Sequence, residues 1–311
     1  MRRIAVTSPS FSRHPLLRDE LLARFPGARL RDDEERLDGD RLRTYLAGCD
    51  GAVIGLETVN AALLDTLPNL RIVAKYGVGL DNIDQAACAA CDVAVGWTPG
   101  INAQSVAELT LCFMLGLMHN TFFTSTQLRA GQWVKRGGKQ LSGKTVGVIG
   151  VGHTGQALIR LLSPFGCRVL ANDIADRNAF CAATGVIATT KERIFSEADI
   201  LSLHVPLTPD THHLINASTL SRMRPGTFII NTARGPVVDE EALKSALEGG
   251  HIGGAALDVF AEEPPRDRAL IEHPRLVATP HIGGNADEAI LAMGRSAIEH
   301  LERFFRGGTA A

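Results

Sequence analysis

Three short segments in the second half of the sequence carry side chains suited to acid–base chemistry. They are Asn231–Gly235, which contains an arginine, Asp258–Pro264, which contains several carboxylates, and Thr279–Gly284, which contains a histidine. Each segment directly follows a short apolar run that is typical of a β-strand. Because ligands of open α/β sheets bind at the carboxyl ends of the strands, we expect the three segments to face one crevice.

The residue types in this crevice suit the oxidation of an α-hydroxy acid. The planar guanidinium of Arg234 can bind a carboxylate through two parallel hydrogen bonds. An unperturbed histidine has a pKa of about 6.5, so the ring of His281 can take a hydroxyl proton near neutral pH. A neighbouring glutamate, Glu263, can orient this ring and stabilise its protonated form.

Each of these residues also has a purely structural interpretation. Arg234 could form a surface ion pair, and His281 could be a core histidine. Glu262 could be the partner of the histidine, which would leave Glu263 as a solvated charge. We expect three other histidines to be structural, namely His204, His212 and His213.

A glycine-rich segment, Gly150–Gly155, matches the pattern G-x-G-x-x-G. An apolar run, Lys144–Ile149, precedes it, and a helical pattern over Gln156–Leu162 follows. In this context Gly150 permits a tight turn, Gly152 lets the backbone approach a pyrophosphate, and Gly155 lets the helix pack on the strand. The free N–H groups at the start of the helix also favour phosphate. A tight turn without a ligand is the alternative.

Asp173 ends the next predicted strand, which is where dinucleotide-binding proteins carry an acidic residue. Its carboxylate can accept hydrogen bonds from a ribose diol, and its charge would repel a 2′-phosphate. The sequence therefore predicts NAD as the cofactor rather than NADP.

Short apolar runs alternate with helical patterns along almost the whole chain, which predicts α/β architecture with parallel sheets. A helical pattern without an early breaker, Asn102–His119, and a polar connection, Arg129–Gly143, separate two such series. The strands expected in the first series are Ile4–Thr7, Gly51–Ile54, Arg71–Ala74 and Val93–Val95, with a helix over Pro15–Phe25 and then an acidic, arginine-rich segment to Asp40. The further strands expected in the second series are Arg168–Ala171, Ile200–His204, Thr227–Asn231, Gly254–Leu257 and Leu276–Ala278, and the final helix is Asp287–Phe305.

Composition excludes several classes of protein. The 311 residues include 32 basic and 34 acidic side chains, so the net charge of −2 argues against a nucleic-acid binder. The longest apolar stretch, Leu109–Met118, is too short to span a bilayer. The first residues do not form a signal peptide, and six cysteines are not a disulfide framework, so we expect a cytoplasmic protein. The pair Cys88 and Cys91 lacks the partners of a zinc site, so no metal is expected, and helix packing is favoured over redox or metal chemistry.

Beyond these features, the sequence resembles the D-isomer-specific 2-hydroxyacid dehydrogenases, and within them the phosphoglycerate dehydrogenases. The matching stretches occur in the order of the family and span nearly the whole chain. They are Gly77–Asp84, Ser105–Thr110, Gly147–Gly152, His204–Thr208, Asn231–Gly235, Val237–Glu240, Ala256–Phe260, Glu262–Pro264 and Pro280–His281.

The resemblance implies a role for each site residue. Arg234 is expected to hold the substrate carboxylate and carbonyl oxygen, Glu263 to tune the histidine, and His281 to be the catalytic acid and base. Asp258 is expected to face the nicotinamide carboxamide. The other residues expected to line the cofactor are His153, Thr154, Val205, Thr232, Ala233, Gly283 and Gly284. The substrate is expected to meet Lys75, Gly77 and the backbone of Val78 and Gly79.

Five positions depart from the phosphoglycerate dehydrogenase pattern. Gly55 and Lys75 stand where that group often has arginines, Val78 stands where threonine is common, and His153–Thr154 replaces an arginine–isoleucine pair. One lysine gives a point charge rather than two guanidinium forks, yet it predicts an anionic or polar group beyond C2. The favoured substrate pair is 3-phosphoglycerate and phosphohydroxypyruvate. The alternatives are a glyoxylate or hydroxypyruvate reductase, a dehydrogenase of another anionic 2-hydroxy acid, and an NAD-sensing corepressor-like binding protein.

The family pattern also predicts two doubly wound domains. Residues 1–100 and 284–311 would form a discontinuous, flavodoxin-like substrate domain, and residues 101–283 an inserted Rossmann domain that binds NAD. A homodimer is expected, with contacts along Asn102–His119 and Thr121–Trp133. A chain of this length is expected to hold these two domains without an appended regulatory domain.

Overall fold

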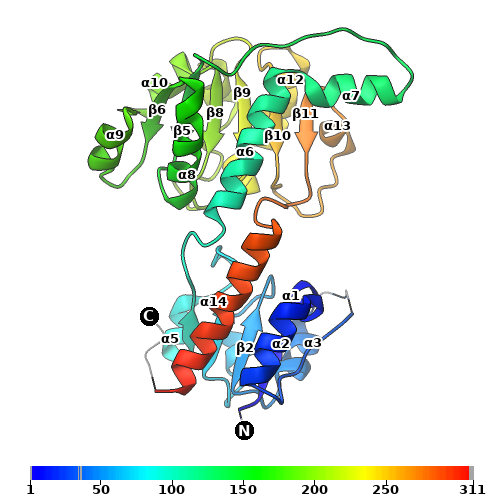
Figure 1. Cartoon of the computed structure of the whole chain (residues 1–311), viewed down its shortest axis with the longest axis vertical. Helices are drawn as coiled ribbons and strands as arrows, with labels where there is room; N and C mark the ends of the chain where they lie inside the picture. Colours follow the sequence, from blue (N-terminus) through cyan, green and yellow to red (C-terminus); the bar gives the residue numbers. More distant parts are fainter. Residues whose placement is uncertain (1, 34, 36, 308–311) are drawn as a thin grey trace. The chain divides into compact units, whose positions relative to one another are not determined.

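A computed structural model describes residues 2–33, 35 and 37–307 of the chain. The chain divides into two compact units, shown in Figure 1. Unit 1 comprises Met1–Asn102 and Asn285–Ala311, and unit 2 comprises Ala103–Gly284. Both units are α/β structures with parallel sheets, so the predicted fold class is confirmed.

The described residues of unit 1 form a sheet of four parallel strands in the order β1-β2-β3-β4. The segment at Arg29 adds one more parallel bridge beside β1, where its N–H donates to Ile4 and its carbonyl accepts from Val6. With this bridge counted, the segment at Arg29, which follows β1 in the sequence, lies at the outer edge of the sheet beside β1. This is the flavodoxin-like order that the family resemblance predicts. The strands are β1 (Ile4–Val6), β2 (Gly51–Ile54), β3 (Ile72–Lys75) and β4 (Ala94–Gly96).

Helices cover both faces of this sheet because neighbouring strand residues point to opposite sides. Val53 packs with one layer, and its neighbours Ala52 and Ile54 pack with the other. Leu301, from the far end of the chain, is fully buried on the first side, and its truncation to alanine would cost about 2–5 kcal/mol. The helices of the first side are α1 (Pro9–Arg13), α2 (Pro15–Arg24) and α14 (Asp287–Phe305), and those of the second are α3 (Gly39–Leu46), α4 (Ala61–Leu64) and α5 (Gln85–Ala90).

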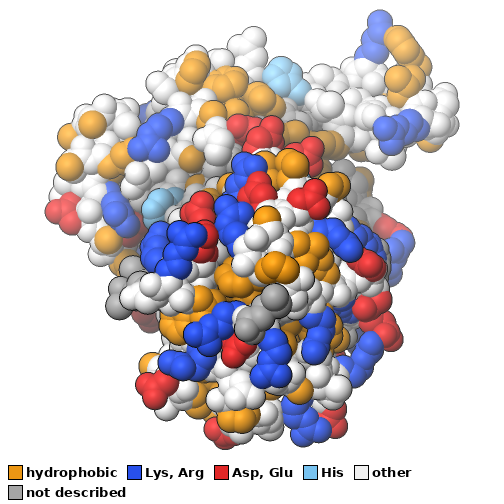
Figure 2. Space-filling model, turned by 60° about the horizontal axis from the view of Figure 1, so that its bottom comes forward, with side chains coloured by type: hydrophobic (Ala, Val, Ile, Leu, Met, Phe, Trp, Pro, Cys, Tyr) orange, Lys and Arg blue, Asp and Glu red, His pale blue; other side chains and the backbone are white. Residues whose placement is uncertain are grey.

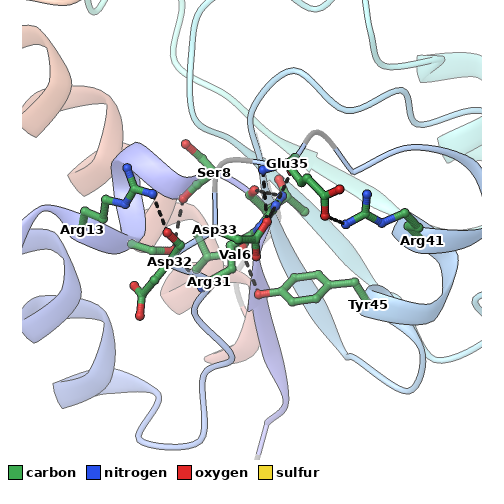
Figure 3. Close-up of polar contacts among 11 residues, drawn as sticks. Val6, Ser8, Arg13, Arg31, Asp32, Asp33, Glu35, Arg41 and Tyr45 are labelled. Atoms are coloured by element: carbon green, nitrogen blue, oxygen red, sulfur yellow. Dashed lines mark hydrogen bonds and ion pairs between the residues drawn. The ribbon is translucent and has the colours of Figure 1, made fainter.

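A buried guanidinium fastens the edge of unit 1 to β1. Arg31 is 5% exposed and donates to the carbonyl of Thr7 at 3.2 Å, to the carboxylate of Asp33 and to the carbonyl of Glu35. Figure 3 shows this cluster together with Tyr45, whose hydroxyl donates to the carbonyl of Val6 at 2.9 Å. A buried charge requires such partners, so Arg31 is committed to the fold.

Unit 2 contains a larger parallel sheet with the order β11-β10-β9-β8-β5-β6-β7 among the described residues. The chain runs outward from β5 to one side through β6 and β7, and then to the other side through β8 to β11. This reversal at β5 is a topological switch point, and ligands bind outside the carboxyl ends of the strands there. The strands are β5 (Thr145–Ile149), β6 (Arg168–Asn172), β7 (Ile187–Ala188), β8 (Ile200–Leu203), β9 (Phe228–Asn231), β10 (Gly254–Leu257) and β11 (Leu276–Ala278).

Two apolar layers also sandwich the sheet of unit 2. On one face lie α6 (Ala103–Met118) and α8 (His153–Leu162). On the other lie α10 (Lys191–Glu197), α11 (Ala217–Ser221), α12 (Glu240–Glu248) and α13 (Arg268–Ile271). The remaining elements are α7 (Thr121–Arg129), α9 (Asn178–Thr184) and the 3₁₀ turns η1 (Ser163–Phe165) and η2 (Gly235–Val237).

Several predicted bounds need correction. Helix α8 begins at His153 instead of Gln156, because the second half of the glycine-rich segment forms its first turn. Helix α3 was not predicted and begins at the end of the acidic, arginine-rich segment, and α7 precedes the predicted polar connection. The edge strand β7 was not predicted, since two residues are too short for a periodic pattern.

All six cysteines are free, and burial raises the pKa of the Cys88 thiol, which opposes its activation. Within residues 2–33, 35 and 37–307, no set of three His, Cys, Asp or Glu side chains could hold a metal ion. On the face seen in Figure 2, Lys and Arg side chains are interspersed with Asp and Glu. No single helix of the described chain could cross a membrane, although the bent pair α6 and α7 meets the length and composition criteria together.

Candidate active site

The glycine-rich loop joins β5 to α8 and is shaped by two close backbone contacts. A Cβ atom on Gly150 would lie 2.2 Å from the carbonyl oxygen of His204, and one on Gly155 would lie 2.1 Å from that of Gly150. A Cβ atom on Gly152 would meet nothing within 4 Å. Two glycines are therefore required by packing, whereas the third borders open space at the N-terminus of α8. This is the arrangement that a dinucleotide pyrophosphate requires.

Asp173 follows β6 and connects this loop to a neighbouring cavity. Its carboxylate accepts hydrogen bonds from the N–H groups of Val151 at 2.7 Å and Ala175 at 2.8 Å. A cavity of about 350 Å³ lies beside it, lined in part by Asn172, Asp176 and Thr189. An acidic side chain at such a cavity fits an adenosine ribose, so the residues present suit a dinucleotide.

His281 lies in the loop that follows β11, in a left-handed backbone conformation with φ 53°. Asp258, at the end of β10, holds this loop in place. Its carboxylate accepts hydrogen bonds from the hydroxyl of Thr279 at 2.5 Å and from the N–H groups of Ile282 at 2.8 Å and Gly283 at 2.7 Å. Its carbonyl accepts from the N–H of His281 at 2.8 Å. These bonds offset a backbone strain of roughly 1–2 kcal/mol at a residue that carries a side chain.

Glu263 is the carboxylate that meets the imidazole. Its Oε2 lies 2.8 Å from Nδ1 of His281, and its Oε1 accepts from the N–H of Phe260 at 3.1 Å. Glu262 instead forms an exposed ion pair with Arg266 at 2.8 Å. The geometry therefore selects Glu263 over its neighbour as the partner of the histidine.

The two groups shift each other's proton affinity. The hydrogen bond to Glu263 raises the pKa of His281 above its usual value, and this effect exceeds the lowering caused by burial. For Glu263, burial raises the pKa, but the hydrogen bonds from His281 and Phe260 outweigh it, so the net pKa is lowered. Near neutral pH the pair therefore favours a carboxylate beside a ring that readily accepts a proton.

Arg234 is presented by the loop after β9, and buried contacts fix that loop. The side chain of Asn231 donates to the carbonyl of Arg234 at 2.8 Å and accepts from the N–H of Ala233 at 3.0 Å. Gly235 packs so tightly that a Cβ atom would lie 1.9 Å from the carbonyl carbon of Phe260. The positive charge of Arg234 acts on the pKa of both Glu263 and His281, lowering each. A fixed cation, a carboxylate and an imidazole thus share one edge of the unit 2 sheet.

The glycine loop Gly77–Gly79 of unit 1 follows β3. Lys75, which ends that strand, is 5% exposed, and its ammonium donates to the carbonyl of Gly55 at 2.6 Å and to the side chain of Asn82 at 2.7 Å. The expected contact of Lys75 with a distal anionic group stays a prediction. The observed bonds give this lysine a second task, which is to tie the loop after β2 to the loop after β3.

Comparisons with known proteins identify the family of this chain. Residues 111–283 match the model of the D-isomer specific 2-hydroxyacid dehydrogenase NAD binding domain. A hydroxypyruvate reductase of Thermotoga maritima is 39% identical over 278 residues, which cover 88% of this chain and 89% of that protein. The chain belongs to the D-isomer specific 2-hydroxyacid dehydrogenase family. It is therefore an NAD-dependent oxidoreductase that acts on a CH–OH group.

Two further proteins that are similar to this dehydrogenase have different substrates in their names. A D-3-phosphoglycerate dehydrogenase of Mycobacterium bovis is 37% identical over 273 residues, which cover 87% of this chain but only 52% of that enzyme. A D-lactate dehydrogenase of Aquifex aeolicus, solved with NAD and lactic acid, is 25% identical with a TM-score of 0.86, and the match covers 98% of this chain and 96% of that one.

The dehydrogenase brings most of its predicted cofactor residues to the carboxyl edge of the unit 2 sheet. Val205 follows β8, Thr232 and Ala233 follow β9, and the hydroxyl of Thr232 lies 3.0 Å from that of Thr110. His204 is half-buried, with Nε2 2.9 Å from the hydroxyl of Ser202, and desolvation of the ring lowers its pKa to about 4, so the ring is neutral. His153, Thr154 and Gly155 form the first turn of α8, and Gly283 and Gly284 follow His281. The predicted substrate residues Lys75, Gly77, Val78 and Gly79 belong to unit 1.

The sequence alone missed several supporting residues of the dehydrogenase. Thr279 bonds to Asp258, and Glu240 accepts from the N–H of Ala261 at 2.6 Å and so steadies the loop of Glu263. Arg177 approaches Asp173 to 3.6 Å, and Ile174 beside it is fully exposed. The sequence signal for Ile174 is an apolar side chain directly after Asp173, the residue predicted to bind the ribose. This signal could have identified Ile174 as part of the cavity lining.

Proposed function

We propose that Arg234, Glu263 and His281 carry out the proton transfer and substrate alignment in a reversible oxidation of a D-2-hydroxy acid to a 2-keto acid. The observation that carries this proposal is the 2.8 Å contact between Nδ1 of His281 and Glu263. With Nδ1 committed to the carboxylate, Nε2 is the ring nitrogen that exchanges a proton with the substrate oxygen.

The chemistry that NAD would supply when bound is hydride transfer, from C2 of the hydroxy acid in oxidation and to C2 of the keto acid in reduction. During oxidation, Nε2 of His281 accepts the hydroxyl proton as the carbonyl forms, and Glu263 stabilises the resulting imidazolium. During reduction, the imidazolium donates that proton to the oxygen at C2. Arg234 aligns the substrate carboxylate through its fork and polarises the carbonyl oxygen.

In unit 1 we assign substrate binding to the backbone N–H groups of Val78 and Gly79, which would receive the substrate carboxylate. Glycine at positions 77 and 79 favours such a role, because backbone donors without Cβ atoms can approach a ligand closely. In unit 2 we assign His153, Thr154, Val205, Thr232, Ala233, Gly283 and Gly284 to cofactor binding at the switch point.

For the substrate we propose hydroxypyruvate, with D-glycerate as the hydroxy acid. Gly55 contributes no side chain at the end of β2, and the ammonium of Lys75 already donates to two protein oxygens. A phosphate on C3 would need several unspent cationic donors, whereas a hydroxyl would not. The similarity to the hydroxypyruvate reductase along 89% of its length supports the same choice.

The second candidate pair is 3-phosphoglycerate and phosphohydroxypyruvate, which the 37% identity to the mycobacterial enzyme supports. Steady-state NADH oxidation with hydroxypyruvate, phosphohydroxypyruvate and glyoxylate separates the candidates. We expect the highest kcat/KM with hydroxypyruvate. A higher value with phosphohydroxypyruvate would reverse the order of the two candidates, and NADH binding without reduction of any 2-keto acid would favour the corepressor-like alternative.

We also propose a homodimer that uses α6, α7 and the segment to Trp133. Helix α7 has no buried side chain among the described residues. The ring of Phe122, in α7, packs against Gly116 of α6. Large apolar side chains of α7 and of the segment that follows it are exposed, among them Leu128 at 57% and Trp133 at 77%. Exposed apolar residues gathered on one projecting segment favour contact with another protein surface.

A further inference from the structure

A tryptophan in unit 1 holds the middle of the glycine loop. Trp97 directly follows β4, and its indole Nε1–H donates to the carbonyl oxygen of Val78 at 2.7 Å. The two residues are 19 positions apart in the sequence, so the bond joins two separate strand-end loops. At this length it is a well-formed hydrogen bond.

The bond also sets the direction of the next backbone donor. The peptide between Val78 and Gly79 is trans. In a planar trans peptide, the carbonyl and the N–H that follows it point in opposite directions. Once Trp97 holds the carbonyl of Val78, the N–H of Gly79 must point away from the indole.

The loop needs such an anchor because glycine makes it pliable. Gly77 has φ 143°, a backbone region that favours glycine, and Gly79 adds a second residue without a Cβ atom. Lys75 and Asn82 fasten the two ends of the loop through the carbonyls of Gly55 and Glu57. Trp97 acts on the segment between those ends.

Trp97 is itself held firmly enough to serve as an anchor. Its neighbour Thr98 contacts α14, where its hydroxyl lies 2.7 Å from Ser296 and 3.0 Å from Nε2 of His300. On the other side, a Cβ atom on Gly96 would lie 2.5 Å from Cβ of His300, so the end of β4 is packed directly on that helix.

We propose that Trp97 is a positioning residue for substrate binding. Its indole N–H fixes the Val78–Gly79 peptide so that the Gly79 N–H is oriented as a donor for the carboxylate of a 2-keto acid. This assignment rests on the proposed role of the Gly77–Gly79 loop. A pre-oriented donor lowers the entropy lost on binding, so the effect belongs in the affinity for the keto acid.

The test removes the indole N–H without changing the ring shape. Site-specific replacement of Trp97 by β-(3-benzothienyl)alanine does this, and Trp97→Phe is the simpler companion. With NADH and hydroxypyruvate, we expect KM for hydroxypyruvate to rise about 5- to 30-fold, the scale of one lost hydrogen bond, with KM for NADH unchanged. A KM for hydroxypyruvate within twofold of the wild-type value in both proteins would overturn the proposal.

A matched control separates positioning from general loosening of unit 1. Tyr45→Phe removes a hydrogen bond elsewhere in unit 1, from the Tyr45 hydroxyl to the carbonyl of Val6, so it should lower the melting temperature and leave KM for hydroxypyruvate unchanged. An equal rise of KM in Tyr45→Phe would overturn the specific role of Trp97.

A second readout does not depend on the substrate. Amide hydrogen exchange of the peptide that spans residues 76–83, measured with NAD bound, should be faster in the benzothienyl protein than in the wild type. Unchanged exchange would overturn the anchoring role. If the wild-type enzyme fails to reduce hydroxypyruvate, the proposed substrate is wrong, while the exchange measurement still decides whether Trp97 anchors the loop.

Discussion

The imidazole of His281 and the carboxylate of Glu263 lie 2.8 Å apart, with Nδ1 of the ring facing Oε2. The two residues come from loops after different strands, β11 and β10, and a chain of backbone contacts holds each loop. This relationship fixes which ring nitrogen is available to a substrate, and it governs how the enzyme should respond to mutation and pH.

Replacing His281 by alanine removes the proposed acid and base. We expect kcat to fall about 10²–10⁴-fold in both directions, which is the usual scale for loss of a general acid–base group. NADH binding, followed by fluorescence titration, should be retained. His273→Ala, which alters another histidine of the same unit, is the control and should keep wild-type turnover. Near-normal kcat in His281→Ala would remove this residue from the mechanism.

Replacing Glu263 by glutamine tests the cause of the raised pKa of His281. The rate of keto-acid reduction requires the imidazolium, so it falls as pH rises through the pKa of His281. Oxidation requires the neutral ring and is lost as pH falls through the same pKa. Without the carboxylate that pKa drops, so both limbs should move to lower pH. Glu262→Gln should leave the pH–rate profiles in place, and an unshifted profile in Glu263→Gln would contradict the pairing.

Asp258→Asn tests whether the buried carboxylate shapes the loop of His281. An asparagine amide would place a donor toward the N–H of Ile282 or Gly283, where the carboxylate now accepts. We expect a loss of about 1–3 kcal/mol in the free energy of unfolding and a lower kcat. Thr279→Val removes one of the three side-chain bonds and should have a smaller effect. Equal or greater damage in Thr279→Val would argue against this ranking.

Asp173→Ser tests coenzyme choice. The serine keeps a hydrogen-bonding group but removes the charge that disfavours a 2′-phosphate, and it releases Arg177 from its 3.6 Å ion pair. We expect kcat/KM to fall about tenfold or more with NADH and to rise with NADPH. Asp176→Ser, in the same cavity wall, is the control. A variant that keeps the wild-type preference for NADH would show that Asp173 does not set it.

Trp133→Asp tests the proposed dimer contact. A carboxylate in a buried apolar interface is strongly unfavourable, so the variant should shift from dimer to monomer in light scattering at micromolar concentration. A charge at Ile187, an exposed apolar residue of the edge strand β7, should leave the oligomeric state unchanged. A wild-type monomer would contradict the proposal outright.

Local pattern predicted the strands well where apolar runs are bounded by polar or turn residues. The bounds of β2, β10 and β11 agree with the predicted strands, because each is a short apolar run with a sharp end. The two-residue β7 offers no such period. The sequence favoured Glu263 over Glu262 only through the family resemblance, since adjacent carboxylates differ only in the path of their loop. In the structure Glu263 is the one that contacts His281.

The sequence also could not predict the protein partners of charged residues that we expected to bind a ligand. For Lys75 and Asp258 the sequence gives the charge but not the protein partners, which come from distant loops. Both side chains are engaged within their own unit, and only the folded chain reveals those bonds. The expected ligand contacts of both residues stay predictions.

The position of α14 has a consequence for folding during synthesis. This helix supplies Ala297, Ile298 and Leu301 to the core of unit 1, yet the ribosome makes it after all of unit 2. The sheet face that carries Val6 and Ile72 therefore stays partly uncovered while the intervening 182 residues, Ala103–Gly284, are translated. Unit 2 can fold during this time. At about 5–20 residues per second this translation takes roughly 10–40 s, during which chaperones and premature association compete for the exposed apolar surface of the nascent chain.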